Sequence, residues 1–389
     1  MSSPRSIGVV TVGRSDFGIY RPVLSLLARD THFKLQVFAG GMHLSPKYGE
    51  TWRDIEREGF RIAAKAVGGE SASSNAEIAA AMGAGLSAFS RIFSSQRPDV
   101  LLVLGDRYEM FAAAAASIPY RIPLAHIHGG EITEGAMDES FRHAITKLSH
   151  LHFVSTQAHG DRVQQMGEEP WRITVCGAPA LDAIRDFQPM DTKTLASRIG
   201  MSLDSAPLLV TYHPATLADM PPERQIAEVL KSLSAWNGPI IFTGVNSDTG
   251  NLHLREAIHN FAARNPNARC IENLGTEAYF TLMSFAAAMV GNSSSGLIEA
   301  PSFGLPVVNI GPRQQGRLRA GNVIDAPCEA SAIATAIHRA PNSDFRSSLR
   351  GLVNPYGDGL ASERIVGRLA ECNLDSDLLV KKFHDLPAR

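Results

Sequence analysis

Short apolar runs alternate with longer segments of helical periodicity from one end of this chain to the other. The runs are continuously apolar, as in residues 100–104 (VLLVL), and do not alternate between apolar and polar residues. Continuous apolar runs suit strands that helices cover on both faces, so the alternation predicts an α/β fold with doubly wound parallel sheets. In the first half, strands are expected at 7–12, 35–39, 100–104, 123–127 and 151–154, and helices at 21–28, 51–58, 75–95, 110–117 and 139–148.

The pattern starts again after residues 188–207. In this segment Pro189 and Pro207 flank a polar helix, so we interpret the segment as a linker between two domains. Because 389 residues exceed what one compact core organises, we predict two Rossmann-like domains, 1–187 and 188–361, that face a cleft. A last helix at 362–371 places residues 362–389 back on the first domain. In the second half, strands are expected at 208–212, 239–242, 268–271, 288–290 and 306–310, and helices at 223–234, 252–264, 276–286 and 329–340.

Composition excludes several classes of protein. Hydrophobic residues make up 44% and charged residues 20% of the chain, which is ordinary for a soluble globular protein, and the net charge of -2 predicts no general affinity for nucleic acid or acidic membranes. The four cysteines form no CxxC pair, so no zinc site is expected from local spacing. The apolar run at 7–12 is too short for a signal peptide, and no run reaches the roughly 20 residues that span a bilayer. We expect a cytoplasmic protein with reduced thiols.

In doubly wound folds, ligands bind beyond the carboxyl ends of the strands, so the residues after each expected strand are the candidates for chemistry. After the first strand, Gly13 and Gly18 are five residues apart, which does not fit the GxGxxG fingerprint of NAD-binding proteins. Arg14 lies between a strand and a helix, where it could pair with a phosphate or remain a solvated turn residue.

Asp106 and Arg107 follow the buried run at 100–104 directly. Charged residues at the end of a buried strand are costly unless they are satisfied, which favours a functional role. The alternative is an Asp–Arg pair that caps the next helix.

The densest group of reactive side chains lies between residues 126 and 143, with three histidines, four acidic residues and one arginine. Its glycines allow the backbone to approach a ligand closely, and its acids could cap amides or transfer protons. A metal site made by His126, His128 and Glu131 is an alternative, although no HExxH spacing is present, and a purely structural role is another.

In the second half, His213 ends a strand, where it is either a hydrogen-bonded core residue or a catalytic one. Asn246 and Asp248 follow the next strand in a loop next to glycine residues.

A serine-rich segment, residues 291–299 (GNSSSGLIE), lies after a further expected strand and before a helix. Its amides, its hydroxyls and the helix dipole predict a phosphate cradle that is not a Walker A loop, and the alternative is a flexible serine loop. Glu299 could accept hydrogen bonds from ribose hydroxyls, and Arg313 places a cation near the same edge.

Six motifs, in this order along residues 7–370, resemble those of the hydrolysing UDP-N-acetylglucosamine 2-epimerases, most closely the sialic-acid and legionaminic-acid branches. They are residues 105–107 (GDR), 126–142, 213–214 (HP), 291–299, 313–317 (RQQGR) and 356–359 (YGDG).

The resemblance implies a glycosyltransferase-B-like fold with UDP held mainly by the second domain. It implies a reaction in which the carbon-2 proton is removed and UDP leaves by anti elimination to give a glycal. Water then adds, which releases UDP and the free 2-epimeric sugar. The resemblance also implies that no cofactor or metal takes part, and that the protein is a homodimer or homotetramer.

Position by position, Asp106 matches the catalytic aspartate of the family, and Asp138 or Glu139 matches a second catalytic acid. Several family members carry Glu where this chain has His128, so either His128 or Glu131 takes that role. The predicted catalytic residues are Asp106, His128, Glu131, Asp138 and His213. The predicted UDP and substrate contacts are Arg14, Arg107, His213, Asn246, Asp248, Leu274, Ser293, Ser294, Ser295, Gly296, Glu299 and Arg313.

Two other functions fit parts of this pattern. A UDP-sugar-dependent glycosyltransferase would share the phosphate cradle, and a non-catalytic nucleotide-sugar sensor would need fewer acids. The acidic residues from Glu131 to Asp138 favour proton transfer, and hence the epimerase. The sugar itself stays open between UDP-N-acetylglucosamine and a 2,4-diacetamido-trideoxy analogue.

Overall fold

The computed structural model describes residues 3–68, 74–134, 137–213, 220–244, 251–272 and 274–386. The chain divides into two compact units, of which the first comprises Met1–Glu131, Met137–Ala183 and Tyr356–Arg389 and the second Ile132–Ala136 and Ile184–Pro355. The expected boundaries after 187 and 361 are therefore shifted. Phe187 packs edge-on against Phe280 and Phe303 of the second unit, whereas the Tyr356 carbonyl accepts a hydrogen bond from the Ala178 amide of the first.

The first unit is built on a seven-stranded parallel sheet with the order β3-β2-β1-β4-β5-β6-β7. The order reverses between β1 and β4, which makes their carboxyl ends the switch point where ligands bind in such sheets. The strands are β1 (Arg5–Thr11), β2 (Phe33–Gly40), β3 (Ile62–Ala66), β4 (Val100–Leu104), β5 (Leu124–Ile127), β6 (Leu151–Val154) and β7 (Ile173–Val175).

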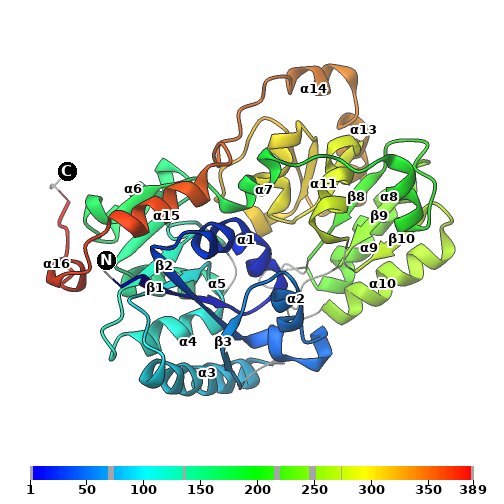
Figure 1. The fold of residues 1–389 in the computed structure, drawn as a ribbon. Coiled ribbons are helices and arrows are strands. Elements are labelled where there is room, and N and C mark those ends of the chain that lie inside the picture. Colours follow the sequence, from blue (N-terminus) through cyan, green and yellow to red (C-terminus); the bar gives the residue numbers. More distant parts are fainter. Residues whose placement is uncertain are drawn as a thin grey trace. The chain divides into compact units, whose positions relative to one another are not determined.

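Helices cover both faces of this sheet, with α1 and α15 on one side and α3 and α4 on the other (Figure 1). The longest helix, α3, starts with a capping box in which Ser74 and Glu77 satisfy each other's backbone amides. The helices are α1 (Arg14–Arg29), α2 (Trp52–Arg57), α3 (Asn75–Ser95), α4 (Tyr108–Ser117), α5 (Asp138–Leu148), α6 (Gln157–Gln165), α7 (Asp182–Arg185), α15 (Ala361–Glu371) and α16 (Ser376–Leu379).

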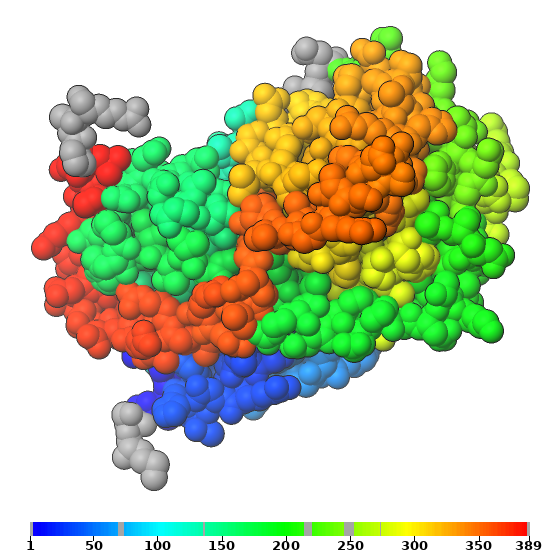
Figure 2. Space-filling view, turned by 90° about the horizontal axis from the view of Figure 1, so that it is seen from above, coloured from blue at the N-terminus to red at the C-terminus, as the bar shows by residue number. Residues whose placement is uncertain are grey.

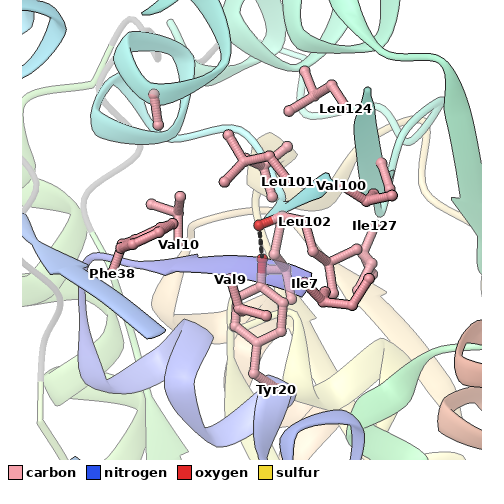
Figure 3. Packing of buried hydrophobic residues seen from close by; sticks show 14 of the residues in the cluster. Ile7, Val9, Val10, Tyr20, Phe38, Val100, Leu101, Leu102, Leu124 and Ile127 are labelled. Carbon is pink, nitrogen blue, oxygen red and sulfur yellow. Dashed lines mark hydrogen bonds between the residues drawn. The ribbon is translucent and has the colours of Figure 1, made fainter. Parts of the chain in front are cut away.

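The core of the first unit forms where α1 packs on β1 and β4 (Figure 3). Ile7, Val9 and Leu102 are fully buried, and burial of each such side chain stabilises the fold by about 1.5–3 kcal/mol. The buried Tyr20 hydroxyl donates a hydrogen bond to the Leu102 carbonyl at 3.4 Å, so α1 and β4 are also linked by a polar contact. This packing fixes the carboxyl ends of β1 and β4.

Figure 2 shows the C-terminal segment, in red, lying against the rest of the first unit, and charged side chains hold it there. The fully buried Glu168 carboxylate accepts hydrogen bonds from Lys147 at 2.6 Å, from Lys381 at 2.8 Å and from His152 at 3.0 Å. Arg172 donates to the backbone carbonyl of Leu378 at 2.8 Å. Residues after α15 therefore contribute to the fold of the first unit.

The second unit contains a six-stranded parallel sheet with the order β10-β9-β8-β11-β12-β13. Its strand order reverses between β8 and β11, as in the first unit. The strands are β8 (Leu208–Thr211), β9 (Ile240–Thr243), β10 (Ala268–Ile271), β11 (Ala288–Gly291), β12 (Val307–Ile310) and β13 (Val323–Ala326). The helices are α8 (Thr192–Ile199), α9 (Pro222–Leu233), α10 (Asn251–Arg264), α11 (Gly275–Phe285), α12 (Ser295–Ile298), α13 (Ala330–Arg339) and α14 (Ser343–Ser348).

The predicted α/β class with two doubly wound sheets is confirmed, but β3, β7 and β13 were not predicted. Each of these strands lies at the edge of its sheet and pairs on one side only. An edge strand is less completely buried, so it lacks the continuous apolar run that identifies central strands. Among the described residues, no helix combines the length and apolarity needed to span a membrane.

Candidate functional site

A cluster of charged side chains lies at the carboxyl ends of β4 and β5 in the first unit. Arg142, from α5, is at its centre with only 2% of its side chain exposed. Its guanidinium donates to the Asp106 carboxylate, to the Glu131 carboxylate at 3.5 Å and to the His128 carbonyl at 3.4 Å. We call Asp106, His128, Glu131 and Arg142 the charged cluster.

The charges of this cluster depend on one another. Burial lowers the pKa of Arg142, but the carboxylates of Asp106, Glu131, Glu139 and Asp138 outweigh it and raise that pKa. A buried arginine is tolerated only when carboxylates compensate it, so Arg142 and its partners form one ionised unit. The predicted catalytic residues Asp106, Glu131 and Asp138 thus surround a single cation.

His128 and Glu131 form the tightest pair of the cluster. The His128 Nδ1 atom lies 2.6 Å from Glu131 Oε1, and both side chains are less than 10% exposed. Ser155, which follows β6, donates a further hydrogen bond to Glu131 Oε1 at 2.9 Å. His128 has a φ of +67°, a left-handed conformation that a non-glycine residue adopts only under constraint.

His126 contacts the backbone beside the charged cluster. Its Nε2 atom donates to the Gly105 carbonyl at 2.7 Å, next to Asp106, and its Nδ1 atom lies 3.3 Å from the Thr146 hydroxyl. Burial lowers the pKa of His126 to about 3, against the hydrogen bond to Gly105, so the ring is neutral at physiological pH. Both ring nitrogens thus face protein groups, and the described residues include no group of three or more His, Cys, Asp or Glu side chains that could hold a metal. These contacts of the His126 ring disfavour the alternative metal site with His128 and Glu131.

The alternative of an Asp106–Arg107 pair is also wrong. Arg107 turns to Glu109, to which it donates two hydrogen bonds at 3.2 and 3.3 Å, and this charge raises the pKa of Arg107. Asp106 pairs with Arg142 and makes no side-chain cap for α4. The two neighbours in sequence therefore belong to different ion pairs.

Asp138 and Glu139 lie in the first turn of α5, where a carboxylate is favoured by the helix dipole. The charge of Asp138 raises the pKa of both Arg107 and Arg142, which places Asp138 near the cluster. Glu139 also raises the pKa of Arg142, and it faces His143 at 3.0 Å. Both carboxylates thus lie near the cluster, and the choice between Asp138 and Glu139 as the second catalytic acid stays a prediction.

Arg14 is exposed at the first position of α1. Two residues later, the buried Asp16 accepts hydrogen bonds from the Val12 amide at 2.7 Å and from the Thr11 hydroxyl at 3.0 Å. Burial raises the pKa of Asp16 to about 6, against these hydrogen bonds. Asp16 thus holds the loop from which Arg14 projects.

Asn292 connects the candidate residues of the second unit. Its side-chain oxygen accepts a hydrogen bond from the His213 amide at 2.8 Å, and its side-chain nitrogen donates to the His213 carbonyl at 2.9 Å. Its backbone carbonyl accepts from Arg313 at 3.3 Å. Burial lowers the pKa of His213 to about 3, and the charge of Arg313 acts in the same direction, so His213 is a neutral imidazole beside a cation.

The serine loop, residues 291–299, starts at Gly291, whose φ is +138°. A Cβ atom there would lie 1.9 Å from the Thr211 carbonyl oxygen, so only glycine fits between β11 and β8. Ser293, Ser294 and Ser295 are half-buried, whereas Gly296 is buried.

The helix expected after this loop is a single turn, α12, because Pro301 directs the chain into a 3₁₀ turn. Glu299 ends α12, and the dipole of so short a helix contributes little. Anion binding here therefore depends on hydroxyls, amides and Arg313.

The remaining predicted contacts are only partly placed. Leu274 is buried immediately before α11. Asn246 and Asp248 lie outside the residues that the structure describes.

Sequence reasoning missed three residues that organise the site, Arg142, Ser155 and Asn292. Arg142 lies on the buried face of α5, where a lone arginine is itself a signal because arginine is rarely buried unpaired. Ser155 and Asn292 each follow a strand directly, the position at which the other candidates were sought.

Comparison with known proteins identifies the family of this chain. The UDP-N-acetylglucosamine 2-epimerase family model matches residues 25–370. The GDP/UDP-N,N'-diacetylbacillosamine 2-epimerase (hydrolyzing) of Campylobacter jejuni is 38% identical over 387 residues, which cover 99% of this chain and 100% of that protein. The UDP-N,N'-diacetylbacillosamine 2-epimerase (hydrolyzing) of Legionella pneumophila is 39% identical over 378 residues, which cover 97% and 98%.

Among solved structures, the UDP-GlcNAc 2-epimerase of Neisseria meningitidis bound to UDP-GlcNAc has a TM-score of 0.79 at 19% identity, and the match covers 94% of this chain and 100% of that chain. This likeness extends over both units and supports the glycosyltransferase-B-like fold class. From the match of the family model and the full-length relatives, this chain belongs to the UDP-N-acetylglucosamine 2-epimerase family.

Proposed function

We propose that this protein is a hydrolysing 2-epimerase of UDP-N,N'-diacetylbacillosamine, a UDP-2,4-diacetamido-2,4,6-trideoxyglucose. The observation that carries the proposal is the full-length likeness to two relatives with this activity in their names, at 38% and 39% identity. UDP-N-acetylglucosamine is the second candidate substrate, since a relative from Neisseria meningitidis named for it is 29% identical over 85% of this chain.

The side chains of the two units support different roles, UDP binding in the second unit and proton transfer in the first. In the second unit, Arg313 would pair with the diphosphate, and Ser294 and Ser295 would donate hydrogen bonds to it. Glu299 would accept hydrogen bonds from the ribose hydroxyls. In the first unit, the charged cluster supplies the groups that move protons. Elimination of UDP needs a base at carbon 2, and addition of water to the glycal needs an acid and a base. The epimerase reaction therefore needs several proton-transferring groups, whereas a glycosyltransferase needs fewer carboxylates.

The direct test is nucleotide release from the sugar nucleotide alone. We expect the protein to release UDP from UDP-N,N'-diacetylbacillosamine without an acceptor, and NMR of the product to show a free sugar inverted at carbon 2. UDP-N-acetylglucosamine should turn over more slowly. Release of UDP only after an acceptor is added would support the glycosyltransferase instead, and equal turnover of both sugars would remove the substrate assignment.

We also propose that UDP binds and reacts without a divalent cation, because Arg313 supplies a positive charge and the serine hydroxyls supply hydrogen-bond donors to the diphosphate. The expected result is that EDTA changes neither UDP affinity nor turnover. Restoration of an EDTA-inhibited protein by Mg²⁺ would contradict this proposal.

A further inference from the structure

Three side chains of the first unit are candidates for the base that removes the proton from carbon 2, namely Asp106, Glu131 and His128. The side chain of Asp106 is 22% exposed, and its carboxylate is paired with Arg142. The other two are less than 10% exposed and lie against each other. The hydrogen-bond partners of each side chain decide which atoms remain available to a substrate.

Both oxygens of Glu131 are already engaged by protein groups. Oε1 lies 2.6 Å from His128 Nδ1 and accepts from the Ser155 hydroxyl at 2.9 Å, and Oε2 faces the Arg142 guanidinium at 3.5 Å. A carboxylate that is buried and accepts from three donors is a weak base, because its charge is stabilised in place. Glu131 therefore has the surroundings of a group that orients another residue.

His128 has the complementary arrangement. An ionised carboxylate can only accept, so the hydrogen shared with Glu131 resides on Nδ1, and Nε2 of the neutral ring carries the lone pair. Among the described residues, no hydrogen bond reaches Nε2. The carboxylate behind the ring also stabilises the imidazolium that forms when Nε2 takes up a proton.

The backbone shows that this orientation is enforced. The His128 amide donates to the Phe153 carbonyl at 3.0 Å, and the His128 carbonyl accepts from Arg142 at 3.4 Å. These contacts hold the residue at a φ of +67°, a strained conformation for histidine. Such strain persists only where the surroundings over-determine it, and it is common at sites that need one fixed side-chain direction.

We propose that His128 is the base of the elimination step and that Glu131 and Ser155 are its positioning residues; this inference rests on the proposed function. The Nε2 lone pair takes the proton from carbon 2, and the electrons of that C–H bond form the double bond between carbons 1 and 2. The bond from carbon 1 to the phosphate oxygen breaks, and its electron pair leaves with UDP. The imidazolium then loses its proton to solvent, and carbon 2 receives a solvent-derived proton when water adds to the glycal.

Two substitutions at His128 separate this role from a structural one. His128→Asn tolerates the left-handed backbone and places an amide N–H near the position of Nδ1, so it keeps a donor for Glu131 but lacks Nε2. His128→Gly also fits the backbone and leaves a space in which added imidazole can bind. Glu131→Gln tests the positioning role, for which kcat should fall while KM and UDP affinity stay unchanged.

We expect turnover of UDP-N,N'-diacetylbacillosamine to fall roughly 10²–10⁴-fold in both His128 variants, with an unchanged UDP affinity. The melting temperature should stay near that of the wild type in His128→Asn and fall in His128→Gly, which loses the contact with Glu131. Imidazole should restore turnover to His128→Gly in a saturable manner but not to Asp106→Asn. Wild-type turnover in His128→Asn, or a folded His128→Gly variant that imidazole does not rescue, would overturn the inference. If the wild-type protein itself releases no UDP from either sugar nucleotide, the proposed function fails, and the inference fails with it.

Discussion

The two units of this protein share an architecture but differ in what their loops carry. In both, a parallel sheet reverses its strand order near the centre, between β1 and β4 in the first unit and between β8 and β11 in the second. The first unit places buried ion pairs at the carboxyl ends of its strands, with Arg142 only 2% exposed. The second places half-buried serines and Arg313 there.

This difference shows how one sheet topology serves two kinds of chemistry. The interaction energy between two charges is larger where water is excluded. Proton transfer needs side chains whose pKa values the protein controls. Recognition of a phosphate instead needs several donors that can remain close to solvent. Ion pairs of the second unit such as Arg255–Glu272 are accordingly open to solvent, with side chains 39% and 50% exposed.

The largest expected effect is a loss of turnover when a carboxylate of the first unit is removed. Asp106→Asn keeps the shape of the side chain but removes its charge, so turnover should fall roughly 10²–10⁴-fold. UDP affinity should stay nearly constant, because the proposed UDP contacts lie in the second unit. Kinetics and isothermal titration with UDP on one variant measure both quantities, and near-normal turnover would remove Asp106 from the mechanism.

Stability provides the second contrast. Burial raises the pKa of Glu168, but hydrogen bonds from His152, Lys147 and Lys381 outweigh it and lower that pKa to about 2. Glu168→Gln removes the buried carboxylate that Lys147, Lys381 and His152 contact, and the free energy of unfolding should fall by about 1.5–3 kcal/mol. The matched control is Glu272→Gln in the exposed pair of the second unit, for which we expect a change below about 1 kcal/mol. Urea denaturation of both variants checks the ranking, and equal losses would contradict it.

The pH dependence of stability tests the burial of His126, which lies next to the charged cluster. His126 has a pKa of about 3 in the folded protein and about 6.5 in the unfolded chain, so the unfolded state binds more protons between these values. The stability due to a neutral His126 is therefore present above pH 6.5 and is lost as the pH falls, by about 2 kcal/mol at pH 5.

His126→Gln removes this titration while keeping an N–H donor for the Gly105 carbonyl. The difference in unfolding free energy between pH 8 and pH 5 should shrink by that amount in the variant, as measured by denaturant titration at both pH values. An unchanged difference would show that His126 is not held neutral by burial.

The smallest expected effect concerns the second unit. Arg313→Gln removes a cation beside His213 and Asn292 but leaves a neutral donor, so UDP affinity should fall about tenfold. At saturating substrate, turnover should change less than UDP affinity does. A large loss of kcat with unchanged UDP affinity would reverse the roles assigned to the two units.

Local signals in the amino-acid sequence were enough to predict the class of fold and the candidate site positions. Continuous apolar runs identified β4 and β11, because central strands are buried on both faces. Asp106 and the serine loop were found because each follows such a strand directly. These are local signals, which a single segment contains in full.

Which of these residues contact one another could be seen only in the folded chain. Arg142 meets Asp106 across 36 residues of sequence, and Asn292 meets His213 across 79. The assignment of Arg107 to Glu109, the pairing of His128 with Glu131 and the edge strands β3, β7 and β13 were likewise not evident beforehand. The physical reason is that an ion pair or an edge strand depends on its neighbours in space, which are set by how the sheet brings distant loops to one edge.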